Sequence, residues 1–97
     1  MYTIIDRISN QEIEGLKVQK ILHAPGFELL SVGLGNGEVF PEHTSPTEAA
    51  LLVLRGNIVF HIGGRTFELT EEELFHIPAG TPHWVEGHED SKFLIIR

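Results

Sequence analysis

Short apolar runs separated by turn-forming residues constrain the fold of this chain more than any other feature of its sequence. Within these runs, apolar side chains alternate with polar ones or follow one another directly, which is typical of half-buried or fully buried β-strands. Gly, Pro, Asn, Asp or Ser residues bound the runs. The runs are residues 2–8, 16–22, 27–34, 49–54, 57–62, 66–69, 74–77, 83–85 and 92–96.

Helical signals are scarce, so these runs predict an all-β fold. Residues 70–74 indicate a single helical turn capped by Thr70, and residues 9–14 indicate another turn, but both are too short to form stable helices. Gly63-Gly64 predicts a two-residue hairpin loop, because both glycines tolerate a positive φ. With 97 residues, we expect one domain over 1–97, built as a β-sandwich or barrel.

Charge and cysteine content exclude several classes of function. Fourteen acidic residues against seven basic ones give a net charge of −7, and no local cluster of Lys or Arg offsets it. Such a surface repels phosphate backbones and anionic lipids, so we expect neither nucleic acid nor a membrane as a partner. The absence of cysteine excludes disulfides, thiolate zinc sites and a cysteine nucleophile.

The sequence also indicates a cellular compartment. Residues 1–7 lack the basic and apolar regions of a signal peptide. The longest apolar run, residues 49–54, is far too short to span a membrane. We therefore expect a cytoplasmic protein.

A first chemical motif starts in the middle of the chain. Gly37 is followed by five residues and then by His43, and Gly56 closes the pattern. The intervening residues 44–55 end in a continuous apolar run, which predicts a buried strand after the histidine.

A second motif follows about one hairpin later, in the order Pro78, Gly80 and His83. Together the two patterns resemble the paired motifs of the cupin superfamily and span about half the chain. Glu72 and Gly87 stand where that family usually has Gly and Asn. The resemblance implies the cupin fold, a double-stranded β-helix or jelly-roll barrel.

The resemblance also implies where metal ligands would lie. In a strand, positions two apart share a face, so residues 43, 45 and 49 are expected to point the same way. Metal-binding cupins use that face for His, His and Glu, and the second-motif His is the fourth ligand. Such a set suits Fe, Mn, Ni, Cu or Zn. Here the face carries His43, Ser45 and Ala49, so only His43 and His83 remain of the implied set.

Glu48 is the candidate for a substitute carboxylate. In an unbroken strand it would face away from His43, whereas a bulge near Pro46, which cannot donate to a β-ladder, would turn it inward. The tentative metal set is therefore His43, His83 and Glu48. Two alternatives stay open for the cofactor: none, or one divalent transition metal such as Fe, Mn, Ni or Zn.

We expect a ligand pocket at the mouth of the barrel, around the two motif histidines. Leu51 continues the apolar lining on the same strand face as Ser45 and Ala49. The predicted pocket residues are His43, Ser45, Ala49, Leu51 and His83.

Three further residues have two interpretations each. His61 and His76 both lie opposite a purely apolar strand face, which favours an exterior or interface position; lining the pocket is the alternative. Trp84 is expected on the outer face or at an interface, and the alternative is an aromatic wall for a ligand.

Three functions are compatible with these residues. The first is a small-molecule binding protein with an incomplete metal site. The second is a metal-dependent cupin enzyme (dioxygenase, isomerase or decarboxylase) that uses His43, His83 and a substitute third ligand. The third is a regulatory or interaction module with a vestigial site. The resemblance also implies a homodimer, in which the apolar segment 2–8 would pair across the interface.

Overall fold

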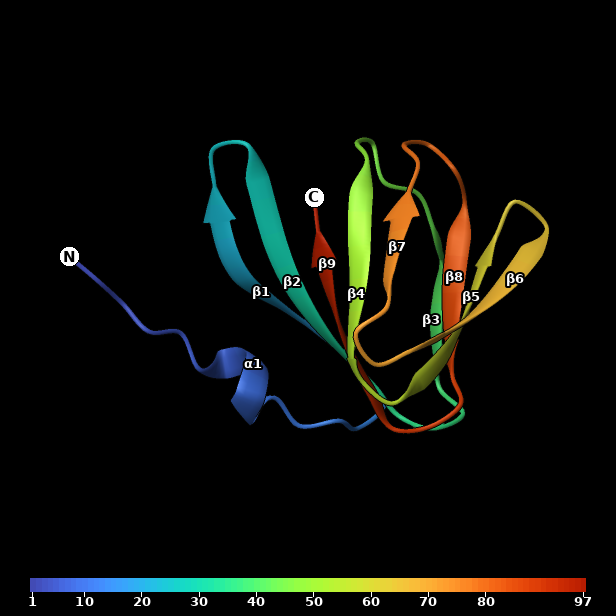
Figure 1. The fold of residues 1–97 in the computed structure, drawn as a ribbon, viewed down its shortest axis with the longest axis horizontal. Helices are drawn as coiled ribbons and strands as arrows, with labels where there is room; N and C mark the ends of the chain where they lie inside the picture. Colours follow the sequence, from blue (N-terminus) through green and yellow to red (C-terminus); the bar gives the residue numbers. More distant parts are fainter.

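Nine strands form two antiparallel sheets, preceded by one helical turn (Figure 1). The computed structural model describes residues 1–97. Every strand except β3 falls on one of the predicted apolar runs. The elements are α1 (Arg7–Asn10), β1 (Leu16–Ala24), β2 (Phe27–Leu34), β3 (Val39–His43), β4 (Ala49–Arg55), β5 (Asn57–Ile62), β6 (Arg65–Thr70), β7 (Leu74–Ile77), β8 (His83–Gly87) and β9 (Ser91–Ile96).

The two sheets pack face to face around one apolar core. The larger sheet has the strand order β1-β2-β9-β4-β7, and the smaller sheet has the order β3-β8-β5-β6. In Figure 1 the hairpin of β1 and β2 extends to the left of the smaller sheet. Buried side chains of both sheets form a single cluster: Val32, Leu34, Ala49, Leu51, Val53, Ile58, Phe60, Leu69, Ile77, Val85 and Phe93.

The core follows from the period-two alternation of the strands. In β4, Ala49, Leu51 and Val53 are buried, whereas Leu52 is half-buried and Leu54 is exposed. Alternate side chains of a strand point to opposite faces, so every second residue of β4 points into the core. The residues of β4 that follow Ser45 along the predicted pocket face are therefore interior.

The hairpin between β5 and β6 has the predicted geometry. Gly63 and Gly64 adopt φ values of +58° and +73°, and Ile62 pairs with Arg65 on either side of them. Positive φ at both loop residues matches the right-handed twist of the flanking strands, which explains why two glycines stand here.

The turn after β6 differs from the expectation of a helical turn over residues 70–74. Thr70 ends β6, and Glu72 adopts a φ of +69°, the one non-glycine residue with positive φ. Glu73 accepts a hydrogen bond from the Thr70 backbone N–H at 2.8 Å. A chain reversal with Glu72 in the left-handed conformation replaces the helical turn. Glu72 stands at the position where the cupin motif usually has Gly.

The N-terminal expectation was wrong: residues 2–8 do not form a strand. Residues 1–6 carry no strand pairing and lead into α1, and their end of the chain projects away from the sheets (Figure 1). An apolar alternation forms a strand only when it pairs with a neighbour, and this segment does not pair with the free edge of β1. Instead, Arg7 donates hydrogen bonds to the backbone carbonyls of Lys20 and Ile21, where β1 is irregular.

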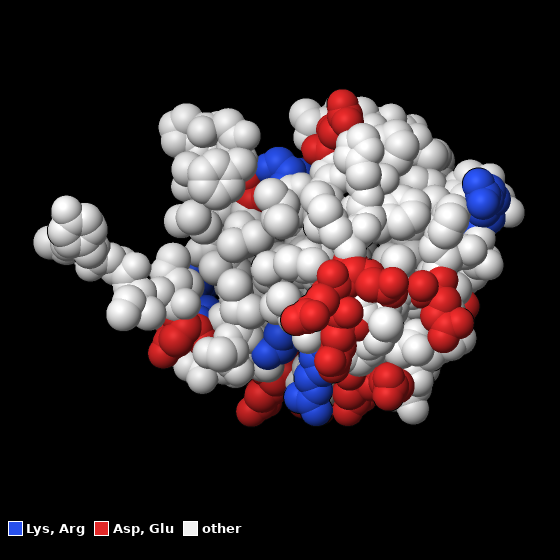
Figure 2. Space-filling model, in the orientation of Figure 1, with Lys and Arg blue, Asp and Glu red and all other residues white.

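The charges are distributed unevenly over the molecule. Figure 2 shows acidic side chains gathered on the lower half of the displayed face, while the upper half carries few charges. The helix α1 has four residues, so it is too short to span a membrane.

Candidate functional site

His43 and His83 lie next to each other at the upper end of the smaller sheet. His43 ends β3 and His83 begins β8, and their Cα atoms are partners in the antiparallel ladder. The centroids of the two imidazole rings are 4.3 Å apart, with the rings inclined by 66°. The two motif histidines, forty residues apart in the chain, are therefore brought together, as the resemblance to the paired motifs implies.

An irregularity in β3 sets the position of His43. The register shifts between Phe40 and His43, on the segment that contains Pro41. Proline has no N–H to donate to a ladder, so a shift at this place costs the sheet little. The Phe40 ring stacks on His43 at 4.6 Å as a result, and Phe60 stacks on His83 at 5.5 Å.

Both imidazoles are fixed in the same tautomer by the backbone. The Nδ1 atoms of His43 and His83 each lie 2.8 Å from a carbonyl oxygen, that of Pro41 and of Thr81 respectively. A carbonyl only accepts, so Nδ1–H donates and the neutral ring keeps a lone pair on Nε2. No protein group forms a hydrogen bond with either Nε2. The pair therefore offers two free acceptors to a ligand.

Burial makes His83 the more unusual of the two. Its side chain is 3% exposed, whereas His43 is half-buried. Burial lowers the pKa of His83 below its ordinary value; the hydrogen bond to the Thr81 carbonyl opposes this effect, and the neighbouring His43 adds to it. His83 is therefore held in its neutral form near neutral pH.

The other predicted pocket residues are also interior. Ser45, Ala49 and Leu51 are buried, and the Ser45 Oγ has no hydrogen-bond partner. The backbone of Ser45 is fixed, because its carbonyl accepts a hydrogen bond from the Gly80 N–H at 2.8 Å. The structure has four cavities, and none of them is lined by any of the five predicted pocket residues.

Glu48 does not join the histidine pair. Its side chain is exposed, and its Oε1 accepts a hydrogen bond from His76 Nε2 at 2.5 Å. The bulge expected near Pro46 lies instead near Pro41, so nothing turns Glu48 inward. His76 is exposed as well, which excludes it from the interior.

His61 lies on the outer face of the smaller sheet. Its ring stacks on Trp84 with 3.6 Å between centroids, and its Nε2–H donates to Glu86 Oε1 at 2.9 Å. Both aromatic residues therefore lie outside the barrel. An exterior position was expected for each, and for His61 the reason was the apolar strand face opposite it.

The donors around the pair do not fit a resident metal ion. Protein sites for catalytic metals usually supply three or more ligands. No group of three His, Cys, Asp or Glu side chains is arranged to hold a metal ion. Ser45 offers only a neutral hydroxyl and Ala49 offers no donor. Two imidazole nitrogens are therefore the whole strong donor set.

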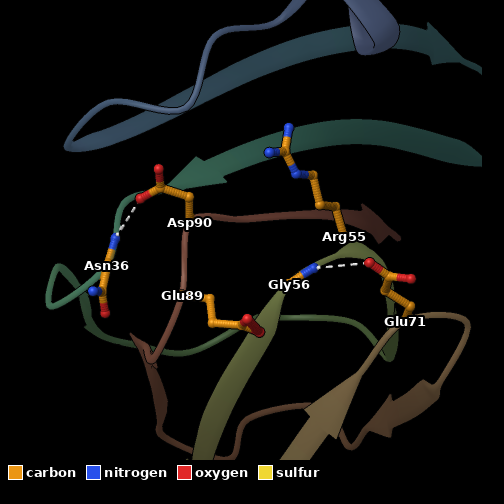
Figure 3. A pocket seen from close by; sticks show the side chains of 6 residues that line it. All are labelled: Asn36, Arg55, Gly56, Glu71, Glu89 and Asp90. Carbon is orange, nitrogen blue, oxygen red and sulfur yellow. Dashed lines mark hydrogen bonds between the residues drawn. The ribbon is translucent and has the colours of Figure 1, made fainter.

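A polar cavity of about 430 Å³ lies at the opposite, lower end of the barrel (Figure 3). There the Asn36 N–H donates to Asp90 Oδ1 at 2.9 Å, and the Gly56 N–H donates to Glu71 Oε1 at 3.5 Å. Arg55 forms no ion pair with them. The two carboxylates satisfy turn N–H groups, so this end is built for loop closure. The sequence did not predict this cavity, because turn-forming residues do not indicate which distant loops will lie beside them.

Comparison with known proteins identifies related chains. The family model of the Cupin domain matches residues 30–97. The chain is 36% identical over 58 residues to quercetin 2,3-dioxygenase of Bacillus subtilis (strain 168), which covers 59% of this chain and 17% of that protein. It is 38% identical over 60 residues to acireductone dioxygenase 1 of Pectobacterium atrosepticum, 58% of this chain and 35% of that protein. The chain thus spans about a third or less of these relatives.

Solved structures share the fold. A conserved protein of unknown function from Streptococcus pyogenes superposes with a TM-score of 0.85 at 21% identity, and the match covers 99% of this chain and 86% of that one. At this identity the likeness shows the fold alone. The two antiparallel sheets therefore form a jelly-roll barrel of the kind that the motifs predict.

Proposed function

Because this chain belongs to the cupin family, we propose that it binds a small molecule through His43 and His83 at the upper end of the barrel. The proposal rests on the unsatisfied polar groups of His43, His83 and Ser45. Two Nε2 lone pairs have no protein partner. The Ser45 hydroxyl, two residues after His43 in the chain, is buried without one. A buried polar group without a partner costs about 1–3 kcal/mol. A ligand that bonds to the Ser45 hydroxyl would recover that free energy, and the two Nε2 atoms would accept further hydrogen bonds from it.

The chemistry of the pair supports a ligand that donates hydrogen bonds. Both Nε2 atoms are acceptors in the neutral rings, and Ser45 can accept as well as donate. The chain carries a net charge of −7, which disfavours an anion. Neutral molecules with neighbouring hydroxyl groups therefore suit the site best. The half-buried His43 is the side from which such a ligand would enter.

Thermal unfolding in the presence of candidate ligands tests the proposal. A molecule that binds only the folded chain stabilises it by about 2.7 kcal/mol at a hundredfold excess over Kd. Sugars, polyols and phenols should raise the melting temperature more than organic acids do. The rise should disappear in His43→Ala and persist in His88→Ala, which removes an exposed histidine elsewhere. If no compound in these classes shifts the wild-type melt, the proposal fails.

A metal-dependent enzyme is the second candidate, favoured by the two free Nε2 atoms and by similarity to two dioxygenases. Elemental analysis of purified protein separates the two. Stoichiometric Fe, Mn, Ni or Zn that is lost in His43→Ala would favour the enzyme. A chain with neither metal nor small-molecule ligand would favour the interaction module.

We also propose that the chain forms a homodimer. On the outer face of the larger sheet, Leu22 pairs with Leu29, Leu29 with Ile96, and Ile96 with Ala50, which makes an apolar row across four strands. Leu22 and Ile96 are 39% and 36% exposed. A second copy would remove this row from water, at about 25 cal/mol per Å² of apolar surface.

A further inference from the structure

We infer a second binding site, for a small organic cation, on the outer face of the smaller sheet. A cavity of about 280 Å³ lies where β5 meets the hairpin of Gly63 and Gly64. Its other walls are Trp84, His61, Pro82 and Glu42, together with Ile62 and Thr81. None of these residues belongs to the predicted pocket around His43 and His83. The site is therefore additional to the proposed function.

The aromatic wall of this cavity is held in place. His61 lies flat on Trp84, with 3.6 Å between ring centroids and 6° between planes. Its Nε2–H donates to Glu86 Oε1 at 2.9 Å, and His88 Nε2 lies 3.7 Å from the same oxygen. A ring fixed in this way loses little rotamer freedom when a ligand arrives, which lowers the cost of binding.

The charges favour a cation over an anion or a neutral guest. Glu42 is the only Asp or Glu in the lining, and no Lys or Arg lines the cavity. The nearest basic residue in sequence, Arg65, is placed with its guanidinium 5.0 Å from the centre of the Phe67 ring. An indole face attracts cations more strongly than any other side-chain ring does. Because His61 covers one face of the Trp84 indole, the cation would contact the opposite face. The ligand that suits both residues is an aliphatic ammonium ion, which would contact the Trp84 ring and pair with the Glu42 carboxylate.

The cavity is a neighbour of the histidine pair without being part of it. Thr81 lines the cavity, and its carbonyl accepts the hydrogen bond from His83 Nδ1–H. Ile62 lines it as well and is the ladder partner of His83. The loop before β8 thus separates two sites, one on each side of the smaller sheet.

Tryptophan fluorescence tests this site directly, because Trp84 is the only tryptophan in the chain. The probes are choline and its uncharged isostere 3,3-dimethylbutan-1-ol, titrated at about pH 8, where ordinary histidines are uncharged. Choline should change the emission saturably and bind on the order of tenfold more tightly than the alcohol, the size of one good cation–π contact. Equal binding of the two probes, or no saturable change with either, would overturn the inference.

Two matched variants distinguish a local effect of Glu42 on choline binding from the effect of the chain's net charge. Glu42→Gln should weaken choline binding on the order of tenfold. Glu38→Gln makes the same change in charge near the other end of β3, where no cavity is lined by the residue, and should leave binding unchanged. Equal losses in Glu42→Gln and Glu38→Gln would reduce the effect to long-range charge and refute the site.

Discussion

His83 and Glu72 each occupy an environment that their residue type disfavours. His83 is an ionisable side chain buried in an apolar barrel. Glu72 is a non-glycine residue whose backbone adopts the left-handed conformation. Such positions cost free energy and are found where function or a required turn outweighs the cost. The two residues therefore allow the site and the turn to be tested separately.

The depressed pKa of His83 predicts a pH dependence of stability. Below the ordinary value of 6.5, the unfolded chain binds this proton more readily than the folded chain does. The stabilisation is therefore complete above 6.5 and is lost as pH falls through the folded-state pKa. NMR titration of the His83 ring should give a midpoint below 6.5. In urea unfolding, the stability of the wild type relative to His83→Asn should decline between about pH 7 and 5. A midpoint at or above 6.5 would contradict the burial argument.

The strained turn predicts a gain of stability on substitution. Glu72→Gly should raise the free energy of unfolding by about 0.5–1 kcal/mol, because glycine adopts a positive φ without a steric clash of its side chain. Glu72→Ala removes the same carboxylate but keeps the β-carbon, so it should give no comparable gain. Urea unfolding of the three proteins measures both differences. Equal stabilisation by Gly and Ala would attribute the effect to charge instead of to the backbone.

The strand elements were largely predictable because their signals are local. Period-two apolar runs between turn residues locate β2, β5 and β7 at their observed bounds. β3 escaped because Pro41 and Glu42 interrupt its apolar pattern, although the motif had already placed His43 on a strand. The segment 2–8 failed for the opposite reason: its pattern is strand-like, but no strand pairs with it. Local pattern predicts a strand, while pairing depends on distant residues.

The candidate site was predictable only as far as the motifs extend. The meeting of His43 and His83 follows from two motifs that occupy neighbouring strands. The fate of Glu48 depended on which of two prolines carries the irregularity, and its hydrogen bond to His76 joins residues 28 apart. No spacing rule encodes such a choice. The same holds for the tautomers of the pair, which are set by the carbonyls of Pro41 and Thr81.

At the level of the element, rebuilding the interior face where β3 leads into β4 should create a metal site. Ser45→His with Ala49→Glu places an imidazole and a carboxylate at two buried positions. If these positions share a face with His43 and His83, as the motif implies, the four side chains complete a ligand set. Elemental analysis should then find stoichiometric Zn, Ni or Mn, and the metal should raise the melting temperature.

The matched control for this design is Ser45→His with Ala49→Gln. Glutamine keeps the size of the glutamate side chain at the same buried position and removes the carboxylate. This variant should bind metal more weakly, because an amide oxygen is a weaker ligand than a carboxylate. A folded Ser45→His, Ala49→Glu protein without metal would show that these positions do not share a face with the pair.

On the scale of the whole molecule, both the apolar row of the larger sheet and the projecting N-terminal residues expose apolar side chains that a second copy could cover. Tyr2 and Ile4 are 102% and 94% exposed. They precede residues 8–11, which contact β1, β2 and β9 of the larger sheet. That segment is anchored where Gln11 donates to the Lys17 and Ser31 carbonyls and Lys92 donates to the Ile8 carbonyl. The first residues therefore extend past the sheet with their apolar side chains exposed. The net charge of −7 makes two copies repel each other, so apolar contacts are needed to hold a dimer together.

This arrangement predicts that the first five residues contribute to self-association. Sedimentation velocity over a range of concentrations should show a dimer for the wild type and a shift toward monomer after deletion of residues 1–5. Leu22→Lys should have the same effect, because it places a charge in the apolar row of the larger sheet. Val39→Lys alters an exposed apolar residue of the smaller sheet and should leave the dimer intact. A wild type that stays monomeric at every concentration, or a dimer that Val39→Lys dissociates as fully as Leu22→Lys does, would place the interface elsewhere or exclude it.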